Sequence, residues 1–261
     1  MTELLNVFIV VTLIGIAAGV LLAVASYFLR VEENEQIKKV RECLPGVNCG
    51  ACGFTGCDEY AKAIVENNAK TNLCIPGADE TAKEISALLG TEFEDVVEMV
   101  AYVKCNGKCA SRQFIYDGID KCTAAKMVYG GEKTCKYACL GCGDCAKVCP
   151  QNAIFMRDNV AKVDPSLCIG CSMCVKECPN GIIELIPQIS KVKVLCSNTL
   201  SGAITRKMCV DGCIGCKKCE KNCPENAIKV ENNLAKIDYD LCTGCGKCAE
   251  VCPVHCISAN R

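Results

Sequence analysis

The hydrophobic and polar positions of the chain separate an apolar N-terminal stretch from a longer remainder of short elements. The stretch Leu4–Leu29 contains no charged residue, and its clearly polar residues are Asn6, Thr12 and Ser26. An uncharged stretch of this length can cross a bilayer as a helix, and it lacks the polar face of a surface helix. The pattern therefore predicts a retained transmembrane helix within residues 1–30.

A cleaved signal peptide is an alternative for this stretch, because the triplet Ala23-Val24-Ala25 resembles a cleavage site. However, Glu3 stands where a signal peptide carries positive charge, and the apolar run is longer than usual. No Lys or Arg precedes the span. The positive charges that follow it are Arg30, Lys38, Lys39 and Arg41. The positive-inside rule then predicts a single-pass protein of the cell (inner) membrane, with its N-terminus outside and the rest in the cytoplasm.

Beyond the span, the pattern predicts short helices followed by short strands. Asp58–Asn68 and Glu80–Leu89 read as helices with apolar inward faces. A capping box of Thr91 and Glu94 predicts a third helical segment that continues through Met99. Further along, apolar patches and Asn-containing turns alternate in the manner of short hairpin strands. The remainder is thus predicted to consist of small α+β modules with little regular structure.

Cysteine is the most unusual feature of the composition, with 28 in 261 residues. One spacing, Cys-x2-Cys-x2-Cys-x3-Cys-Pro, occurs four times. It is typical of bacterial two-cluster ferredoxins, in which three cysteines of a run bind one cluster and the fourth binds the other. The four runs are Cys139-Cys142-Cys145-Cys149, Cys168-Cys171-Cys174-Cys178, Cys213-Cys216-Cys219-Cys223 and Cys242-Cys245-Cys248-Cys252.

The crossing of each fourth cysteine groups these runs into two pairs and predicts four [4Fe-4S] clusters. A glycine precedes the second cysteine of every run, where a missing Cβ lets the backbone approach the cluster closely. The predicted ligand sets are Cys139, Cys142, Cys145 and Cys178; Cys168, Cys171, Cys174 and Cys149; Cys213, Cys216, Cys219 and Cys252; and Cys242, Cys245, Cys248 and Cys223.

A fifth [4Fe-4S] cluster is predicted upstream, where three cysteines on a glycine-rich loop are followed by one distant cysteine. Its predicted ligands are Cys49, Cys52, Cys57 and Cys74.

The cysteines outside these five sets are candidates for a sixth cluster or for buried thiols. Four of them lie within one connector, and a cluster held there has the ligands Cys105, Cys109, Cys122 and Cys135. An alternative set joins the two halves of the chain and consists of Cys122, Cys135, Cys196 and Cys209. Cys43 and Cys256 fit buried thiols better, because reduced cysteine behaves as a small hydrophobic residue.

An internal repeat relates the two pairs of runs. A shift of 74 positions (213 − 139) places each cysteine of the first pair on a cysteine of the second. The same shift places Cys122 on Cys196 and Cys135 on Cys209. The predicted domains are a transmembrane helix (1–30), an N-terminal 4Fe-4S domain (31–90), a cysteine-containing connector (91–134), a first ferredoxin module (135–190) and a second one (191–261).

Charge and chemistry exclude several other classes of protein. Structural zinc suits Cys-x2-Cys pairs, but runs that end in Cys-Pro and a single histidine favour iron–sulfur clusters. Disulfides fit tight runs poorly, and reduced thiols indicate the cytoplasm. A nucleic-acid-binding protein would carry a basic patch, whereas this chain has 29 Lys+Arg against 30 Asp+Glu. No nucleotide-binding motif and no catalytic side chain are predicted.

The order of these motifs resembles that of one known family. An apolar span, the sequence LPGVNCGACGFTGC with Cys74-Ile-Pro-Gly after it, and ferredoxin modules are together similar to the B subunit of the Rnf complex. The resemblance covers the whole chain, and the two ferredoxin modules match the long form found in anaerobes. It assigns the family's first cluster to the set that ends at Cys74.

The resemblance implies a role in electron transfer. The family belongs to a membrane-bound, ion-translocating ferredoxin:NAD⁺ oxidoreductase. We therefore expect a membrane-anchored subunit that accepts electrons from reduced soluble ferredoxin and relays them to the other Rnf subunits, while Na⁺ or H⁺ is moved outward. An alternative is a polyferredoxin subunit of another membrane enzyme, of the hydrogenase or formate dehydrogenase type.

Overall fold

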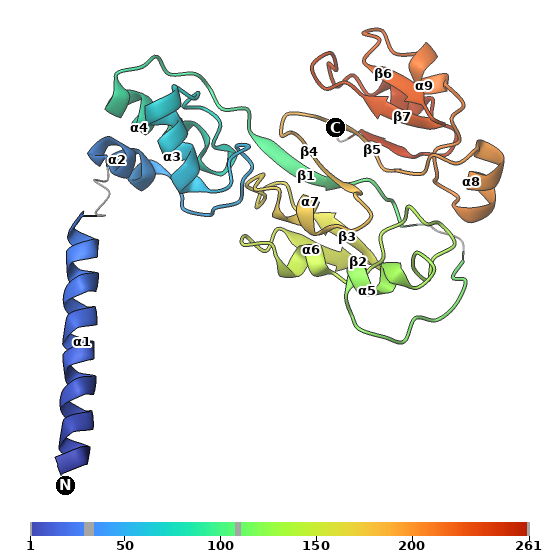
Figure 1. Cartoon of the computed structure of the whole chain (residues 1–261). Helices are drawn as coiled ribbons and strands as arrows, with labels where there is room; N and C mark the ends of the chain where they lie inside the picture. Colours follow the sequence, from blue (N-terminus) through green and yellow to red (C-terminus); the bar gives the residue numbers. More distant parts are fainter. Residues whose placement is uncertain (1, 29–33, 108–110, 260–261) are drawn as a thin grey trace. The chain divides into compact units, whose positions relative to one another are not determined.

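The computed structural model describes the chain except residues 1, 29–33, 108–110 and 260–261 (Figure 1). The chain divides into two compact units, Met1–Lys39 and Val40–Arg261. Helix α2 (Glu35–Cys43) runs across the boundary between them.

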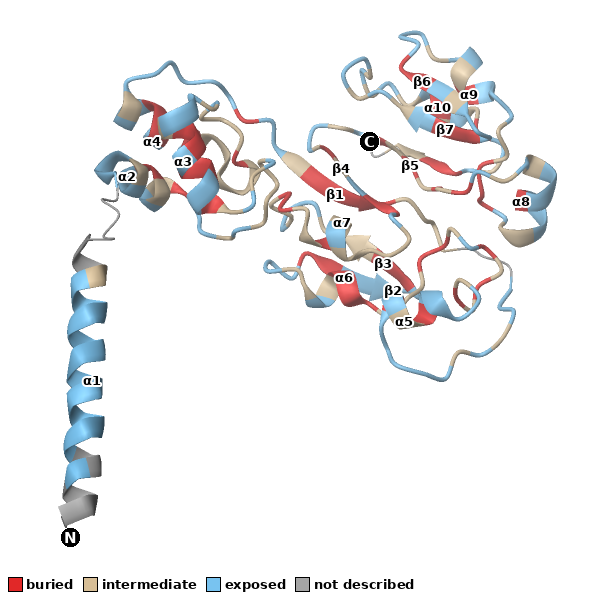
Figure 2. Cartoon of the chain, in the orientation of Figure 1, coloured by how far each residue is buried: buried red, intermediate tan, exposed pale blue. Residues whose placement is uncertain are grey.

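The first unit consists mainly of helix α1 (Thr2–Phe28). Most of its described apolar side chains are exposed, among them Leu13, Ile16 and Leu21 (Figure 2). Among the residues that the structure describes, no helix is both long and apolar enough to cross a membrane. The predicted span of residues 1–30 begins and ends on residues outside those described.

The second unit begins with a small helical domain. Helices α3 (Cys57–Asn67) and α4 (Ala78–Leu89) coincide with the two helices that the sequence predicts, and a short 3-10 helix, η1 (Ile75–Gly77), precedes α4. Asn68 follows the end of α3 and Gly90 follows the end of α4, and both residues adopt the left-handed conformation that commonly terminates a helix.

Tyr60 of α3 connects the core of this domain to the chain that leads to Cys74. Its side chain is buried with Ile64 and Ile85. Its hydroxyl donates a hydrogen bond to the carbonyl of Lys70 at 2.7 Å and accepts one from the N–H of Leu73 at 3.1 Å. These two bonds hold the segment before Cys74 against the helices.

The predicted third helix, from Thr91 to Met99, is wrong. Residues 91–98 form no regular element, and from Met99 the chain forms strand β1 (Met99–Val103). β1 pairs in antiparallel fashion with β4 (Ile183–Pro187), and all its residues except the first are buried. Branched and aromatic residues favour such a buried strand, so this tertiary pairing outweighs the local capping pattern. It also joins part of the predicted connector to the first ferredoxin module.

Both ferredoxin modules are built from two two-stranded sheets and very short helices (Figure 1). In each module an inner hairpin lies where the sequence predicts hairpin strands, and an outer pair joins distant segments. The inner hairpins are β2 (Ile154–Arg157) with β3 (Val160–Val163), and β6 (Ile228–Glu231) with β7 (Leu234–Ile237). The second outer pair is β5 (Val192–Val194) with β8 (Ile257–Ala259).

The short helices position cysteines. Four of them carry the third cysteine of a run, namely α6 (Asp144–Lys147), α7 (Met173–Glu177), α9 (Lys218–Lys221) and α10 (Lys247–Glu250). The other two precede the runs of each module, namely α5 (Cys122–Met127) and α8 (Gly202–Met208).

Equivalent backbone hydrogen bonds mark the repeat in the structure. The N–H of Lys104 donates to the carbonyl of Ile182, and the N–H of Leu195 donates to that of Cys256, both at 2.7 Å. The two acceptors are 74 positions apart (256 − 182), whereas the two donors are 91 apart (195 − 104). The first module therefore contains 17 extra residues (91 − 74) between its outer strand and its first cysteine run.

Cysteines form much of the core of the second module. They pack with aliphatic residues of the strands, including Val192, Ile228 and Ile257. The buried cysteines of this core are Cys196, Cys213, Cys219, Cys248, Cys252 and Cys256. The first module has the same kind of core, and Figure 2 shows buried residues on β1 and β3, whereas β2 is mostly exposed.

Candidate iron–sulfur centres

The N-terminal domain brings together the four cysteines of its predicted set. The first two lie on a loop in which Gly50 and Gly53 have positive φ, the third begins α3, and the fourth directly precedes η1. The side-chain oxygen of Asn48 accepts a hydrogen bond from the N–H of Cys57 at 2.8 Å. The pKa of Cys74 is raised to about 11, mainly by burial and to a smaller extent by the three other thiols of the set. All four sulfurs therefore share one environment.

The first run of the first module faces a cavity with about 380 Å³ of empty space, part of it open to solvent. Cys139, Cys145 and Cys178 of the predicted set line it, together with Cys122. Burial raises the pKa of Cys145 to about 12, and Cys139 and Cys178 contribute to the rise. The remaining member of the set, Cys142, has Cys122 as its hydrogen-bonding neighbour.

The second set of this module is also brought together. Burial raises the pKa of Cys174 to about 12, and the next contributions come from Cys168, Cys171 and Cys149. Two backbone N–H groups point at sulfurs of this set: Ala101 donates to Cys168 at 3.4 Å and Ala153 donates to Cys149 at 3.3 Å. Such N–H···S bonds raise the reduction potential of a bound cluster.

The second module contains two cavities, each lined by all four cysteines of one predicted set. One has about 300 Å³ of empty space and is lined by Cys213, Cys216, Cys219 and Cys252. The other has about 350 Å³ and is lined by Cys223, Cys242, Cys245 and Cys248.

Cys256 lies against the first of these sets. Its sulfur is 3.7 Å from that of Cys252. Hydrogen bonding to the Cys256 thiol lowers the pKa of Cys252 to about 5 and that of Cys213 to about 6. The sequence predicts a buried thiol at this position, and the structure adds a role in stabilising the thiolate form of two candidate ligands.

The donor chemistry of these sets fits iron–sulfur clusters. Most candidate thiols with a shifted pKa have it raised by burial, as at Cys219 and Cys248, and a bound cation offsets the cost of ionising a buried thiol. Among the described residues, no three Cys, His, Asp or Glu side chains are placed to share a single metal ion. In a cubane each thiolate binds a different iron atom, so its four ligands surround a cavity.

The N-terminal domain and the first module meet at two of these sets. The ammonium group of Lys176 donates a hydrogen bond to the carbonyl of Cys49 at 2.6 Å. The thiol of Cys49 also contributes to the raised pKa of Cys171, after the dominant effect of burial. Two candidate centres therefore lie next to each other across this contact.

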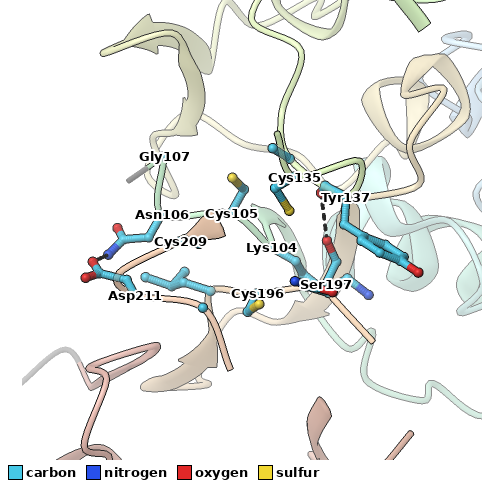
Figure 3. A pocket seen from close by; sticks show the side chains of 14 residues that line it. Lys104, Cys105, Asn106, Gly107, Cys135, Tyr137, Cys196, Ser197, Cys209 and Asp211 are labelled. Atoms are coloured by element: carbon cyan, nitrogen blue, oxygen red, sulfur yellow. Dashed lines mark hydrogen bonds between the residues drawn. The ribbon is translucent and has the colours of Figure 1, made fainter. Parts of the chain in front are cut away.

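The cysteines outside the five sets are distributed differently from the local prediction. Cys109 lies outside the described residues. Cys122 lies beside Cys142, and its N–H donates to Asp144 at 2.6 Å. Cys105 and Cys135 share a further cavity with Cys196 and Cys209 (Figure 3). Because of the 17-residue insertion, Cys105 and Cys196 are 91 positions apart (196 − 105), so a constant shift of 74 does not relate them.

Comparison with protein families supports the presence of iron–sulfur domains in this chain. A family model described as "Putative Fe-S cluster" matches residues 44–76. Models described as "4Fe-4S dicluster domain" match residues 138–182, 167–228 and 204–259. 4Fe-4S dicluster domains are thus shown in both ferredoxin modules.

Three relatives are similar over nearly the whole chain. The B subunit of the proton-translocating ferredoxin:NAD(+) oxidoreductase complex of Clostridium ljungdahlii is 44% identical, over 92% of this chain and 86% of the relative. The B subunit of the Na(+)-translocating complex of Acetobacterium woodii is 40% identical, over 94% and 75%. The B subunit of an ion-translocating oxidoreductase complex of Methanosarcina acetivorans is 41% identical, over 91% of both chains. The chain therefore belongs to the family of B subunits of ion-translocating ferredoxin:NAD⁺ oxidoreductase (Rnf) complexes.

Proposed function

We propose that this chain carries electrons within an ion-translocating ferredoxin:NAD⁺ oxidoreductase complex, as its family does. The observation that carries the proposal is that two cavities of the second module are each lined by the four cysteines of one predicted set. When bound there, [4Fe-4S] clusters supply one-electron redox chemistry. The protein provides their positions and potentials and needs no acid, base or nucleophile.

The ligand sets are those that the spacing predicts. We assign Cys49, Cys52, Cys57 and Cys74 to one cluster and the four crossed sets of the ferredoxin modules to four more. Support comes from the proximity of neighbouring sets. The thiol of Cys49 contributes to the raised pKa of Cys171, and the thiol of Cys174 contributes to the raised pKa of Cys145. This proximity of neighbouring thiols favours a continuous row of centres from the N-terminal domain into the first module.

Reduced soluble ferredoxin is the proposed electron donor, and the other Rnf subunits are the proposed acceptors. The names of the relatives support both, because they describe complexes that couple ferredoxin and NAD⁺ to the movement of Na⁺ or protons. The alternative, a polyferredoxin subunit of a hydrogenase or formate dehydrogenase, lacks this support.

Membrane attachment through α1 is part of the proposal. It rests on the absence of charge from Leu4 to Leu29 and on the exposed apolar side chains along the described part of α1. The positive charges lie on the C-terminal side of this stretch, which favours an outer N-terminus and cytoplasmic iron–sulfur domains.

Electron transfer is tested in the purified complex with Cys57→Ala, which removes a proposed ligand of the N-terminal cluster. We expect NAD⁺ reduction by reduced ferredoxin to fall to background in this variant. Cys43→Ala is the matched control, because it removes a nearby cysteine outside the five sets, and it should retain activity. Equal activity of both variants, in complexes with the same subunit content, contradicts the proposal. Reduction of the clusters by hydrogen or formate, with none by ferredoxin, supports the alternative enzyme type.

Topology is tested with a reporter fused after Arg261. A reporter that is active only in the cytoplasm should be active, and one that is active only outside should be silent, because the positive charges follow the span. Accessibility of the C-terminus from outside the cell contradicts both the orientation and the proposed access of soluble ferredoxin.

A further inference from the structure

We propose that Cys105, Cys135, Cys196 and Cys209 hold a sixth [4Fe-4S] cluster between the two ferredoxin modules. All four line one cavity with about 370 Å³ of empty space, part of it open to solvent (Figure 3). Three cavities lined by cysteines of the predicted sets have about 300, 350 and 380 Å³. The fourth cavity is thus of the same size and has the same type of lining.

The repeat provides the strongest argument, because it makes the site from two equivalent pairs of cysteines. Cys105 follows the donor of the bond from Lys104 to Ile182, and Cys196 follows the donor of the equivalent bond from Leu195. Each of these cysteines is the second residue after the outer strand of its module.

The second pair is equivalent by its distance from the cysteine runs. Cys135 and Cys209 each stand four positions before the first cysteine of a run, at Cys139 and Cys213 (139 − 135 and 213 − 209). Each module therefore supplies one cysteine from its outer strand and one from the lead-in to its first run. Four thiols in this arrangement match the ligand number of a [4Fe-4S] cluster.

The backbone around Cys196 resembles that of the predicted ligands. The N–H of Cys213 donates a hydrogen bond to the sulfur of Cys196 at 3.3 Å. The same kind of N–H···S bond, at 3.3 and 3.4 Å, reaches Cys149 and Cys168 in the first module. Bonds of this type stabilise thiolate and bound cluster alike.

Polar contacts fix the two modules on either side of the cavity. Asn106, next to Cys105, donates to the carboxylate of Asp211 at 2.6 Å. Ser197, next to Cys196, donates to the carbonyl of Tyr137 at 3.0 Å. Both bonds cross between the modules beside a proposed ligand (Figure 3), so the four sulfurs are held around the cavity from both sides.

The position indicates what the sixth cluster is for. Cys105 contributes to the raised pKa values of both Cys139 and Cys196, which places it near the first set of the first module. Cys196 contacts Cys213 of the first set of the second module. A cluster at this site connects the two modules by single-electron exchange. This role rests on the proposed function, whereas the presence of the cluster does not.

Iron analysis of single variants tests the site directly. Cys105→Ala, Cys196→Ala and Cys209→Ala should each lose about four irons and as many sulfides per chain. The double variant Cys196→Ala/Cys209→Ala should lose the same four and no more. Cys43→Ala is the inert control and should lose none.

Several results would overturn the proposal. Unchanged iron in the Cys105, Cys196 and Cys209 variants makes these residues structural thiols. Loss of four irons from the Cys105 variant, with unchanged iron in the Cys196 and Cys209 variants, supports the local ligand set instead. Loss of one zinc from each of the three variants shows a mononuclear site.

A conservative variant covers the case in which alanine destabilises a whole module. Serine can replace a cysteine ligand through its oxygen, so Cys209→Ser should keep the fold and alter the EPR signal of one reduced cluster. An EPR spectrum identical to that of the unmodified chain contradicts a ligand role. Since these measurements read metal content and spectra, they succeed or fail independently of ferredoxin-dependent activity.

Discussion

Removal of iron from the anaerobically purified chain is expected to unfold both ferredoxin modules. Their sheets have only two strands each, and an isolated two-stranded hairpin is marginally stable in water. Half of the buried core residues of the second module are cysteines that face the proposed clusters or lie beside them. Small metal domains can owe about 10 kcal/mol or more of folding free energy to their metal. This matches the entire stability of a typical domain, about 5–15 kcal/mol.

The measurement is limited proteolysis with far-UV circular dichroism before and after anaerobic chelation of iron. We expect protease cleavage throughout residues 135–261 and loss of the cooperative thermal transition of these modules. A transition that keeps its midpoint after complete iron removal would contradict a metal-dependent core. Reconstitution with iron and sulfide should restore protection.

The Gly170→Ala substitution is expected to destabilise the first module strongly. Gly170 precedes the second cysteine of its run and has φ of +64°, where a Cβ costs about 1 kcal/mol. A Cβ there would lie 2.5 Å from the carbonyl oxygen of Met99 and 2.8 Å from Ile75. Relieving such overlap typically costs about 1–3 kcal/mol more. The expected total is about 2–4 kcal/mol.

Gly244→Ala is the matched control for this prediction. Gly244 is the counterpart of Gly170 at the shift of 74 and also has positive φ, at +72°. Its Cβ would meet only the side chain of Lys191, at 3.6 Å, which is ordinary contact. Denaturant unfolding should therefore show about 1 kcal/mol of destabilisation in this variant. Equal losses in both variants would contradict the close packing of the Gly170 loop against β1.

The cysteine spacing could indicate candidate sites because the ligand runs are local. Within each ligand set of the ferredoxin modules, three of the four cysteines come from one run, and only the fourth comes from the other run of the pair. The hairpins and the helices α3 and α4 were predictable for the same reason, since their patterns and turns are contained in short windows. Two cavities of the second module are each lined by all four cysteines of one set, and a cavity of the first module is lined by three of the four members of its first set.

The missed features depend on contacts between distant segments. The pairing of β1 with β4 joins residues 80 to 88 positions apart (183 − 103 and 187 − 99), and the local capping pattern at Thr91 points to a helix instead. The grouping of Cys105 with Cys196 has the same cause, because it becomes visible only when the outer strands of both modules are paired. Sequence spacing alone relates Cys196 to Cys122, which lies in another cavity.

We propose that the cysteine sets of this chain hold iron–sulfur clusters. Iron and acid-labile sulfide analysis of the anaerobically purified chain, combined with EPR of the reduced protein, measures the cluster content. Five sets predict about 20 irons per chain, and the sixth site raises this to about 24, with equal sulfide. Stoichiometric zinc, without broad visible absorption and without an EPR signal on reduction, would contradict the account.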